Sequence, residues 1–434
     1  MHKVLIIGLG LCFAASLGAQ GTPDARKKSP ESPPHDIKSL IAEILRIHPL
    51  LRSRQIEAQA ADLDAQAVAR QKWGSVSLTT ETNGAQAHTG SYASRMLRLD
   101  QTVWDNGLAR SREDEAQVRL DQAQLQIDEQ VQDLSLQASQ AWQALNAARG
   151  KIDAARNALE RLRGYMQQMS RRVQSQASPQ IDLELTQARI LQTEAELTAA
   201  QGSYRLAVQK LENLSGLQGL TGRMPVTQSL VSAAQQKRMA AQLAQETDWN
   251  ATVTQHPTYL RTKYEIQALE HKLSAKKAEQ WPQVYLRMDK PLAQNELAGI
   301  SSMSPSYYAG IRYNTGAGLV GHAEAQAMAA RLGESEQRVH AVRQELQQQL
   351  SADKEEFTNN HARLPGLTRS VSSSETVLAS YLRQFHAGKK NWQDLLNVQR
   401  ELLQNQYALS DAHASLLGAV LRLQIRTSQP IQTD

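Results

Sequence analysis

The chain has 434 residues, a mass of 48.1 kDa and a net charge of +5, with 48 Lys and Arg against 43 Asp and Glu. Aromatic residues make up only 5% and the mean hydropathy is −0.50, so an aromatic-rich globular core is not expected. A helical membrane transporter is not expected either, because no apolar run reaches the ~20 residues of a spanning helix. The charge is mild and no Lys/Arg cluster occurs with aromatic residues, so nucleic acid is not a predicted partner.

Residues 1–19 have the pattern of a secretory signal peptide. A basic residue, Lys3, precedes an apolar run over 4–17, which is too short to span a bilayer and ends in small residues. The alternative is an N-terminal membrane anchor. The only cysteine of the chain, Cys12, lies in this segment, so the mature protein is predicted to contain neither a disulfide nor a thiol. The polar, Pro-rich stretch 20–36 is predicted to be a flexible lead-in.

The remaining sequence repeats one pattern twice. His48, which precedes a proline, has a counterpart at His256, an offset of 208 residues, and a tryptophan follows each histidine 25 residues later, at Trp73 and Trp281. Two further matches follow in the same order, at offsets of 211 and 212: Gly107 with Gly318, and Asp182 with Asp394. Four matches in one order predict two copies of a single unit.

The repeat sets the predicted organisation: a first copy over 37–216, a connector over 217–242, a second copy over 243–426 and a tail over 427–434. Each copy has a helix, two strands, a very long helix, a turn and a returning helix. In the first copy these are helix 38–72, strands 75–82 and 93–104, and helices 107–174 and 180–214. In the second they are helix 257–281, strands 283–290 and 305–314, and helices 320–385 and 392–425. The predicted fold class is therefore mostly α with a small β part.

Two periodicities support these elements. Strands alternate with a period of two, most clearly in the second copy. One face there is apolar and comprises Val284, Leu286, Met288, Ala309 and Ile311. The other face carries Tyr285, Arg287, Asp289 and Arg312. The first long helix has apolar or small residues every three or four positions from Ala116 to Val173, which is typical of a coiled-coil seam. Pro365 lies inside the second long helix and is predicted to bend or break it.

Four strands cannot close into a barrel, because closure needs about eight. A barrel would therefore be shared between subunits, and three copies would supply twelve strands. In a secreted protein, strands with an apolar outer face indicate the Gram-negative outer membrane. Trp73, Trp104 and Trp281 flank the strands, as an interfacial aromatic belt would. The alternative is a soluble periplasmic sheet with these tryptophans in a core.

The order of elements resembles that of the TolC family of outer-membrane channel proteins, over residues 37–426. The most specific segment is 381–402, YLRQFHAGKKNWQDLLNVQREL, which is similar to the family's second hairpin turn. A weaker match is 177–183, ASPQIDL. The resemblance implies a homotrimer with a 12-stranded β-barrel in the outer membrane, an α-helical barrel across the periplasm and a belt around the connector. It also implies docking of the helix tips onto a periplasmic adaptor and an inner-membrane ABC or other transporter.

The resemblance further implies that the tips close the channel and that acidic residues there face the pore. Asp394 matches the family's acidic residue, while Asn397 stands where some members have a second Asp. Asp182 matches a residue that helps hold the gate shut. Three copies of an acidic residue around an axis attract cations. The alternative is that Asp182 and Asp394 only start their helices, where an acid suits the helix dipole.

Of the remaining tip residues, two depart from the family pattern and one matches it. Phe385 occupies the place of a family tyrosine and lacks its hydroxyl, so a hydrogen bond between residues 385 and 182 is not expected. Lys390 stands where an Arg is frequent, and Gly388 marks the turn.

The predicted function is an outer-membrane exit duct for a tripartite export system, with type I secretion of a large adhesin or RTX-type protein favoured by segment 381–402. The alternatives are efflux of drugs or other small molecules and, in a different class, a non-channel periplasmic coiled-coil scaffold. No motif indicates an enzyme, a metal site or a cofactor: the eleven His are scattered, and the GxGxxG match at 316–321 precedes a helix too long for a nucleotide-binding unit.

Overall fold

The computed structural model describes residues 36–82, 93–217, 219–220, 249–293, 304–313 and 320–427. The predicted signal peptide, nearly all of the lead-in and connector, and the tail after residue 427 lie outside the described residues. Most of the described chain is helical, with one small sheet, which confirms the predicted fold class.

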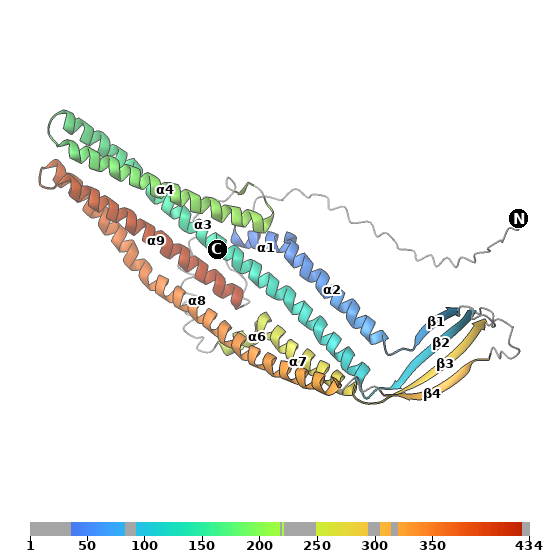
Figure 1. Cartoon of the computed structure of the whole chain (residues 1–434). Helices are drawn as coiled ribbons and strands as arrows, with labels where there is room; N and C mark the ends of the chain where they lie inside the picture. The colour runs from blue at the N-terminus through green and yellow to red at the C-terminus, as the bar shows by residue number, and fades with distance from the viewer. Residues whose placement is uncertain are drawn as a thin grey trace, which may run out of the picture.

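The same order of elements occurs twice (Figure 1). The first half contains α1 (Ile37–Ile47), α2 (Pro49–Arg70), β1 (Ser75–Thr82), β2 (Ala93–Trp104), α3 (Leu108–Gln174) and α4 (Gln180–Ser215). The second half contains α6 (Asn250–Gln255), α7 (Pro257–Ala278), β3 (Gln283–Ala293), β4 (Ser306–Arg312), α8 (Val320–His386) and α9 (Trp392–Arg426). The long helices α3 and α8 each have 67 residues, and α2 and α7 each have 22.

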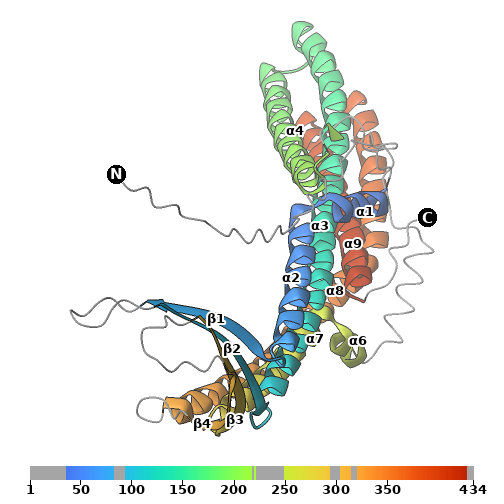
Figure 2. The same ribbon diagram turned by 90° about the vertical axis from the view of Figure 1, so that its right-hand side faces the viewer.

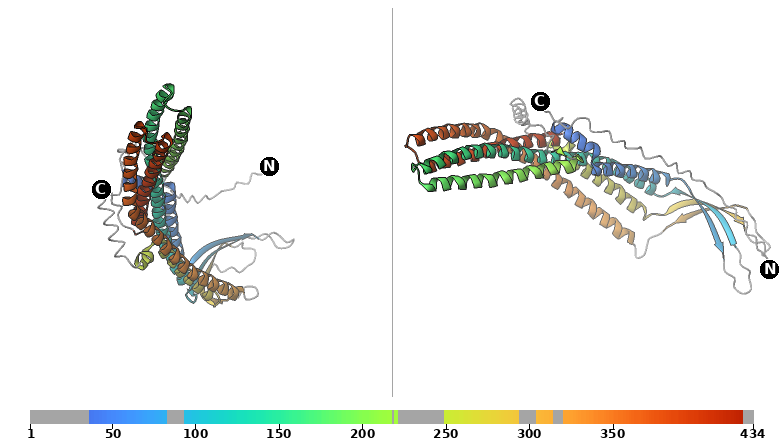
Figure 3. Two further views of the ribbon diagram at one scale, coloured as in Figure 1. Left: turned by 90° about the vertical axis from the view of Figure 1, so that its left-hand side faces the viewer. Right: turned by 90° about the horizontal axis from the view of Figure 1, so that it is seen from above.

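The molecule is elongated, with the sheet at one end and two helical hairpins ending together at the other (Figures 1 and 3). Each hairpin pairs a long helix with its return helix, α3 with α4 and α8 with α9. Nearer the sheet, α3 packs on α2 and α7, and α8 packs on α7 (Figure 2). A helix of 67 residues spans about 100 Å at ~1.5 Å per residue, so the sheet and the tips are far apart.

The predicted seam of α3 is buried along most of its length. Small residues such as Ala138, Ala155 and Ala158 are inaccessible to solvent, which lets the neighbouring helices approach closely. Larger residues of the seam, including Leu134, Leu145 and Leu159, are at least 96% buried. The hydrophobic core therefore runs as a strip along the helices, in place of one central cluster.

The predicted helix 38–72 is wrong in one respect, because it is two helices that meet at His48. The backbone of His48 is extended (φ −62°, ψ 126°), as expected for a residue before proline. Its Nδ1 accepts the backbone N–H of Leu50 at 3.3 Å and so caps α2. His256 repeats this arrangement before Pro257, with Nδ1 accepting the N–H of Thr258 at 3.3 Å. The repeated His-Pro pair is thus a helix-capping device.

His256 should make the fold sensitive to mild acid. Burial and, to a smaller extent, the positive charge of Arg426 lower the pKa of His256 from 6.5 to about 4. The negative charge of Glu129 raises this pKa and offsets part of the effect. The unfolded chain therefore takes up a proton before the folded chain does, and stability falls between about pH 6.5 and pH 4. The loss should reach about 3 kcal/mol. His256→Asn keeps a capping oxygen and removes the titration, so its melting temperature should fall less than that of wild type between pH 7 and pH 4.

The control is His48→Asn, which changes the matching cap in a more exposed setting. Equal acid sensitivity of wild type and His256→Asn would contradict a buried, neutral histidine.

Pro365 does not break α8, which runs without interruption from Val320 to His386. A proline has no N–H to donate to the carbonyl of His361, so one helical hydrogen bond is missing. Pro365 lies on an exposed side of the helix, where water can reach that carbonyl, while the preceding Leu364 is buried. Packing of the buried side thus keeps the helix continuous. This excludes a break at Pro365, while the predicted bend stays a prediction.

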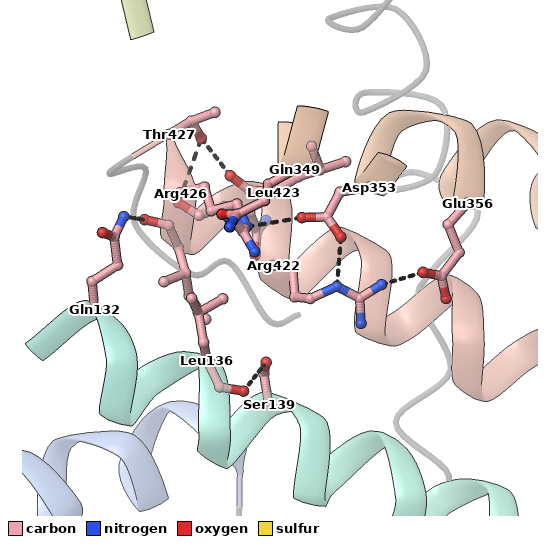
Figure 4. A network of polar contacts seen from close by, with 12 residues as sticks. Gln132, Leu136, Ser139, Gln349, Asp353, Glu356, Arg422, Leu423, Arg426 and Thr427 are labelled. Atoms are coloured by element: carbon pink, nitrogen blue, oxygen red, sulfur yellow. Dashed lines mark hydrogen bonds and ion pairs between the residues drawn. The ribbon is translucent and has the colours of Figure 1, made fainter. Parts of the chain in front are cut away.

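A buried charge network joins α9 to the middle of α8 (Figure 4). Arg422 is 8% exposed and donates from Nε to Oδ1 of Asp353 at 2.6 Å. Its other two nitrogens donate to Glu356 and to Gln143 of α3. Arg426 lies 2.9 Å from the second oxygen of Asp353 and donates to Gln349. One guanidinium therefore connects three helices at mid-length of the molecule.

Candidate functional site

The four strands form one antiparallel sheet in the order β1-β2-β3-β4. The two halves of the chain thus meet at the β2–β3 pair, in which Leu99 lies opposite Met288 and Arg98 opposite Asp289. Within the described residues, β1 and β4 each have a single neighbour, so both outer edges of the sheet are open.

One face of the sheet is apolar. The register places Val284 opposite Ile311, Leu286 opposite Ala309, and Val76 opposite Leu99, so the predicted apolar positions of β3 and β4 share this face with apolar residues of β1 and β2. Their side chains are largely uncovered in the single chain: Leu286 is 51% exposed and Ile311 is 72% exposed. The members of this apolar face are Val76, Leu78, Leu97, Leu99, Val284, Leu286, Met288, Tyr307, Ala309 and Ile311.

The opposite face is polar and holds two ion pairs between β2 and β3. Arg98 contacts Asp289 at 2.9 Å, and Arg287 contacts Asp100 at 2.8 Å. In each pair, the arginine and the aspartate come from different halves of the chain. These cross-strand pairs therefore stabilise the junction between the two halves.

Trp73, Trp104 and Trp281 lie together at the end of the sheet that adjoins the helices. Trp73 precedes β1, Trp104 ends β2 and Trp281 precedes β3, and these three positions share one end because the strands are antiparallel. The three side chains are 78%, 48% and 58% exposed. Exposed tryptophans at one level are the arrangement found at membrane interfaces.

The second candidate region is the pair of hairpin tips. Asp182 lies in the first turn of α4 and Asp394 in the first turn of α9, so both carboxylates stand at the positive end of a helix. Partial burial raises the pKa of Asp182. Lys390 lies 3.9 Å from Asp394 and also 4.6 Å from the ring centre of Tyr381. Gly388 takes the left-handed conformation (φ +70°) that the turn requires.

Aromatic residues join the two tips to each other. Trp392 is 2% exposed, and its Nε1 donates to Oγ1 of Thr186 in the other hairpin at 2.7 Å. The ring of Phe385 lies 4.8 Å from that of Trp392 and beneath the guanidinium of Arg172, 4.9 Å from its ring centre. Tyr165 of α3 contacts Trp392 edge-on. Phe385 thus has an aromatic and cationic environment in place of a hydrogen bond to residue 182.

The structure brings Phe385, Gly388, Lys390 and Asp394 to one tip and Asp182 to the adjoining one. Asn397 lies one turn beyond Asp394 and is partly exposed. Sequence reasoning missed Thr186, Arg172 and the anchoring role of Trp392. The signal for Trp392 was present, since a tryptophan in the first turn of a polar helix needs a buried partner for its N–H.

Removing the Trp392–Thr186 hydrogen bond should loosen the link between the tips. Trp392→Phe keeps an aromatic ring and should destabilise the fold by about 1 kcal/mol, whereas Trp392→Ala should cost about 3–5 kcal/mol. The measurement is chemical unfolding of both variants. In a double-mutant cycle with Thr186→Val, a coupling of about 0.5–1.5 kcal/mol is expected. Strict additivity would contradict a hydrogen bond between the two side chains.

Comparison with solved structures gives matches over nearly the whole chain. CusC, in a study of conformational changes that accompany folding and transmembrane channel formation, aligns with a TM-score of 0.78 and 14% identity, over 93% of this chain and 96% of that one. The outer membrane protein VceC of Vibrio cholerae gives 0.77 and 15%, over 91% and 97%. The open MtrE outer membrane channel of Neisseria gonorrhoeae gives 0.71 and 12%, over 92% and 90%.

The chain has the fold of an outer-membrane channel protein. The resemblance to the TolC family is thereby confirmed at the level of fold. No protein-family model matches the sequence, and no curated protein matches it.

Within the described residues, no group of three or more His, Cys, Asp or Glu side chains could hold a metal ion. None of the described helices is both long and apolar enough to cross a membrane.

Proposed function

We propose that three copies of this chain form an outer-membrane channel that continues as a helical tunnel through the periplasm. The observation that carries the proposal is the sheet: one face is apolar and exposed, the other is polar, and both edges are open. Open edges and an exposed apolar face are unfavourable for a soluble monomer. Closure of three sheets into a 12-stranded barrel in lipid would pair the open edges and cover the apolar face with lipid.

The level of the membrane follows from the tryptophans. Trp73, Trp104 and Trp281 would lie at the periplasmic interface of the outer membrane, with the apolar face against lipid above them. The helices then extend into the periplasm and carry the tips about 100 Å away from the sheet. The long coiled-coil hairpins would pack side by side around the same axis as the barrel.

The tips are the end that would meet the rest of an export machine. We propose that they dock onto a periplasmic adaptor and an inner-membrane transporter, which supplies the energy. Three copies each of Asp182 and Asp394 would form acidic rings at the closed end. The Phe385–Trp392 cluster supports a closed tip without a Phe385–Asp182 hydrogen bond, because it ties the two hairpins together inside each protomer.

For the cargo, we propose type I secretion of a large adhesin or RTX-type protein. Segment 381–402 supports this, since it is similar to channels that serve such secretion. Small-molecule efflux is the second candidate, because the solved structures with this fold are outer-membrane channels in general.

The test compares proteins at the surface and in the medium of a deletion strain with those of its parent. Loss of one or a few very large proteins, restored by the wild-type gene, is the expected result. An unchanged set of secreted proteins, together with increased sensitivity to small toxic compounds, would support efflux. Extraction that needs no detergent and an absence of heat-resistant trimers would support the periplasmic scaffold and overturn the channel.

A further inference from the structure

The polar face of the sheet has an uneven distribution of charge along its length. In the middle of the sheet, Arg98 and Arg287 are neutralised by Asp289 and Asp100. Arg312, the last residue of β4, lies on the same face and pairs in register with Gln283, which is uncharged. Among the described residues no carboxylate forms an ion pair with Arg312, so its charge remains uncompensated at the end of the sheet nearest the helices.

The side chain of Arg312 is held in place by an aromatic ring. Its guanidinium lies 4.9 Å from the ring centre of Tyr285, and Arg287 lies 5.2 Å from the same ring. Tyr285 in turn lies over Gly310, its partner in the ladder: a Cβ added to Gly310 would come within 2.7 Å of the tyrosine hydroxyl. The glycine thus allows the ring to lie flat on the sheet. A ring face attracts a cation without cancelling its charge.

We propose that Arg312 determines the ion preference of the barrel. This inference rests on the proposed function, since it requires three sheets to close with their polar faces inward. Three copies of Arg312 then form a cationic ring where the barrel lumen opens into the helical tunnel. Arginine stays charged at every physiological pH, and a narrow polar lumen with low-dielectric walls concentrates the field of such a ring. The ring favours inorganic anions and carboxylate-bearing segments of a cargo at this level.

The experiment measures the reversal potential of the purified full-length protein in planar bilayers under a KCl gradient. Arg312→Gln should reduce the permeability ratio of Cl⁻ to K⁺ by at least about twofold, because a ring of three charges changes the local potential by about one kT or more. Arg312→Lys should retain the wild-type ratio. The effect should weaken in concentrated salt, because screening shortens the Debye length to ~3 Å at 1 M.

Asp394→Asn is the matched control, because it removes a charge of the opposite sign at the far end of the tunnel. It should not reproduce the loss of anion preference. Formation of heat-resistant trimers by each variant shows that assembly is intact.

A second readout uses the absence of cysteine from residues 13–434. In Arg312→Cys, a negatively charged thiol reagent should lower the anion permeability further, and a positively charged one should restore it. An unchanged reversal potential in Arg312→Gln, with wild-type conductance, would overturn the inference and leave the channel standing. A wild-type protein that forms no heat-resistant trimer and needs no detergent for extraction would instead overturn the proposed function.

Discussion

Leu286→Arg should abolish assembly in the outer membrane. Leu286 is the fourth of the 11 residues of β3, is 51% exposed in the single chain, and shares the apolar face with Ala309 and Ile311. If this face meets lipid, an arginine there costs about 2–4 kcal/mol in each protomer near the bilayer midplane, and the trimer contains three of them. We expect loss of the protein from the outer-membrane fraction, and its degradation or accumulation in the periplasm, measured by fractionation and by heat-resistant trimer.

The control places the same side chain on the other face. The control variant is Ser75→Arg. Ser75 lies on β1 opposite Asp100, at nearly the same level of the sheet as Leu286 but on the polar face, where a water-filled lumen would accept an arginine. Its assembly should match that of wild type. Normal assembly of Leu286→Arg would mean that the apolar face does not meet lipid, and the orientation of the sheet would have to be reversed or abandoned.

Arg422→Ala should produce a large loss of stability in the helical region. The substitution leaves Asp353, which is 6% exposed, with Arg426 as its remaining charged partner, and it removes the donor to Glu356 and Gln143. Deleting one partner of a buried pair costs about 3–5 kcal/mol when the remaining charge is left uncompensated. Because Arg426 still lies beside Asp353, the cost here should be near the lower end of that range. The measurement is chemical or thermal unfolding of the assembled protein, monitored by the loss of its helical circular dichroism signal.

Two comparisons separate the charge from the packing. Arg422→Lys keeps the charge but cannot hold three partners in one plane, so its loss should be intermediate. Adding Asp353→Asn to Arg422→Met removes both charges of this pair and keeps an acceptor oxygen for Arg426, so this double variant should be more stable than Arg422→Ala. If Arg422→Ala unfolds at the wild-type midpoint, the network makes no net contribution.

The sequence was sufficient to predict the elements with a strong period. The alternation of Val284, Leu286 and Met288 identified a strand face, and the seam from Ala116 to Val173 identified a long helix, because each pattern lies within one element. Burial of that seam and the shared apolar face follow directly from the patterns.

Contacts between elements were not predictable in the same way. The hydrogen bond from Trp392 to Thr186 joins residues that are 206 positions apart, and nothing local marks them as partners. The break at His48 was missed because the helical period continues on both sides of it. A break at Pro365 was one of two possible effects of the proline, and the packing of the buried side of α8 excludes it although local propensity favours it.

The equal length of α3 and α8 fixes the distance between the sheet and both hairpin tips. Both have 67 residues, and both start next to the sheet, so their tips arrive at the same height and can be joined by Trp392 and Phe385. Deleting a few residues from one helix would rotate and withdraw one tip only. A shorter molecule with aligned tips therefore requires matched removal of whole heptads from both long helices and both return helices. The distance between the sheet and the tips is thus set by two helices of one chain, and the length of each constrains the other.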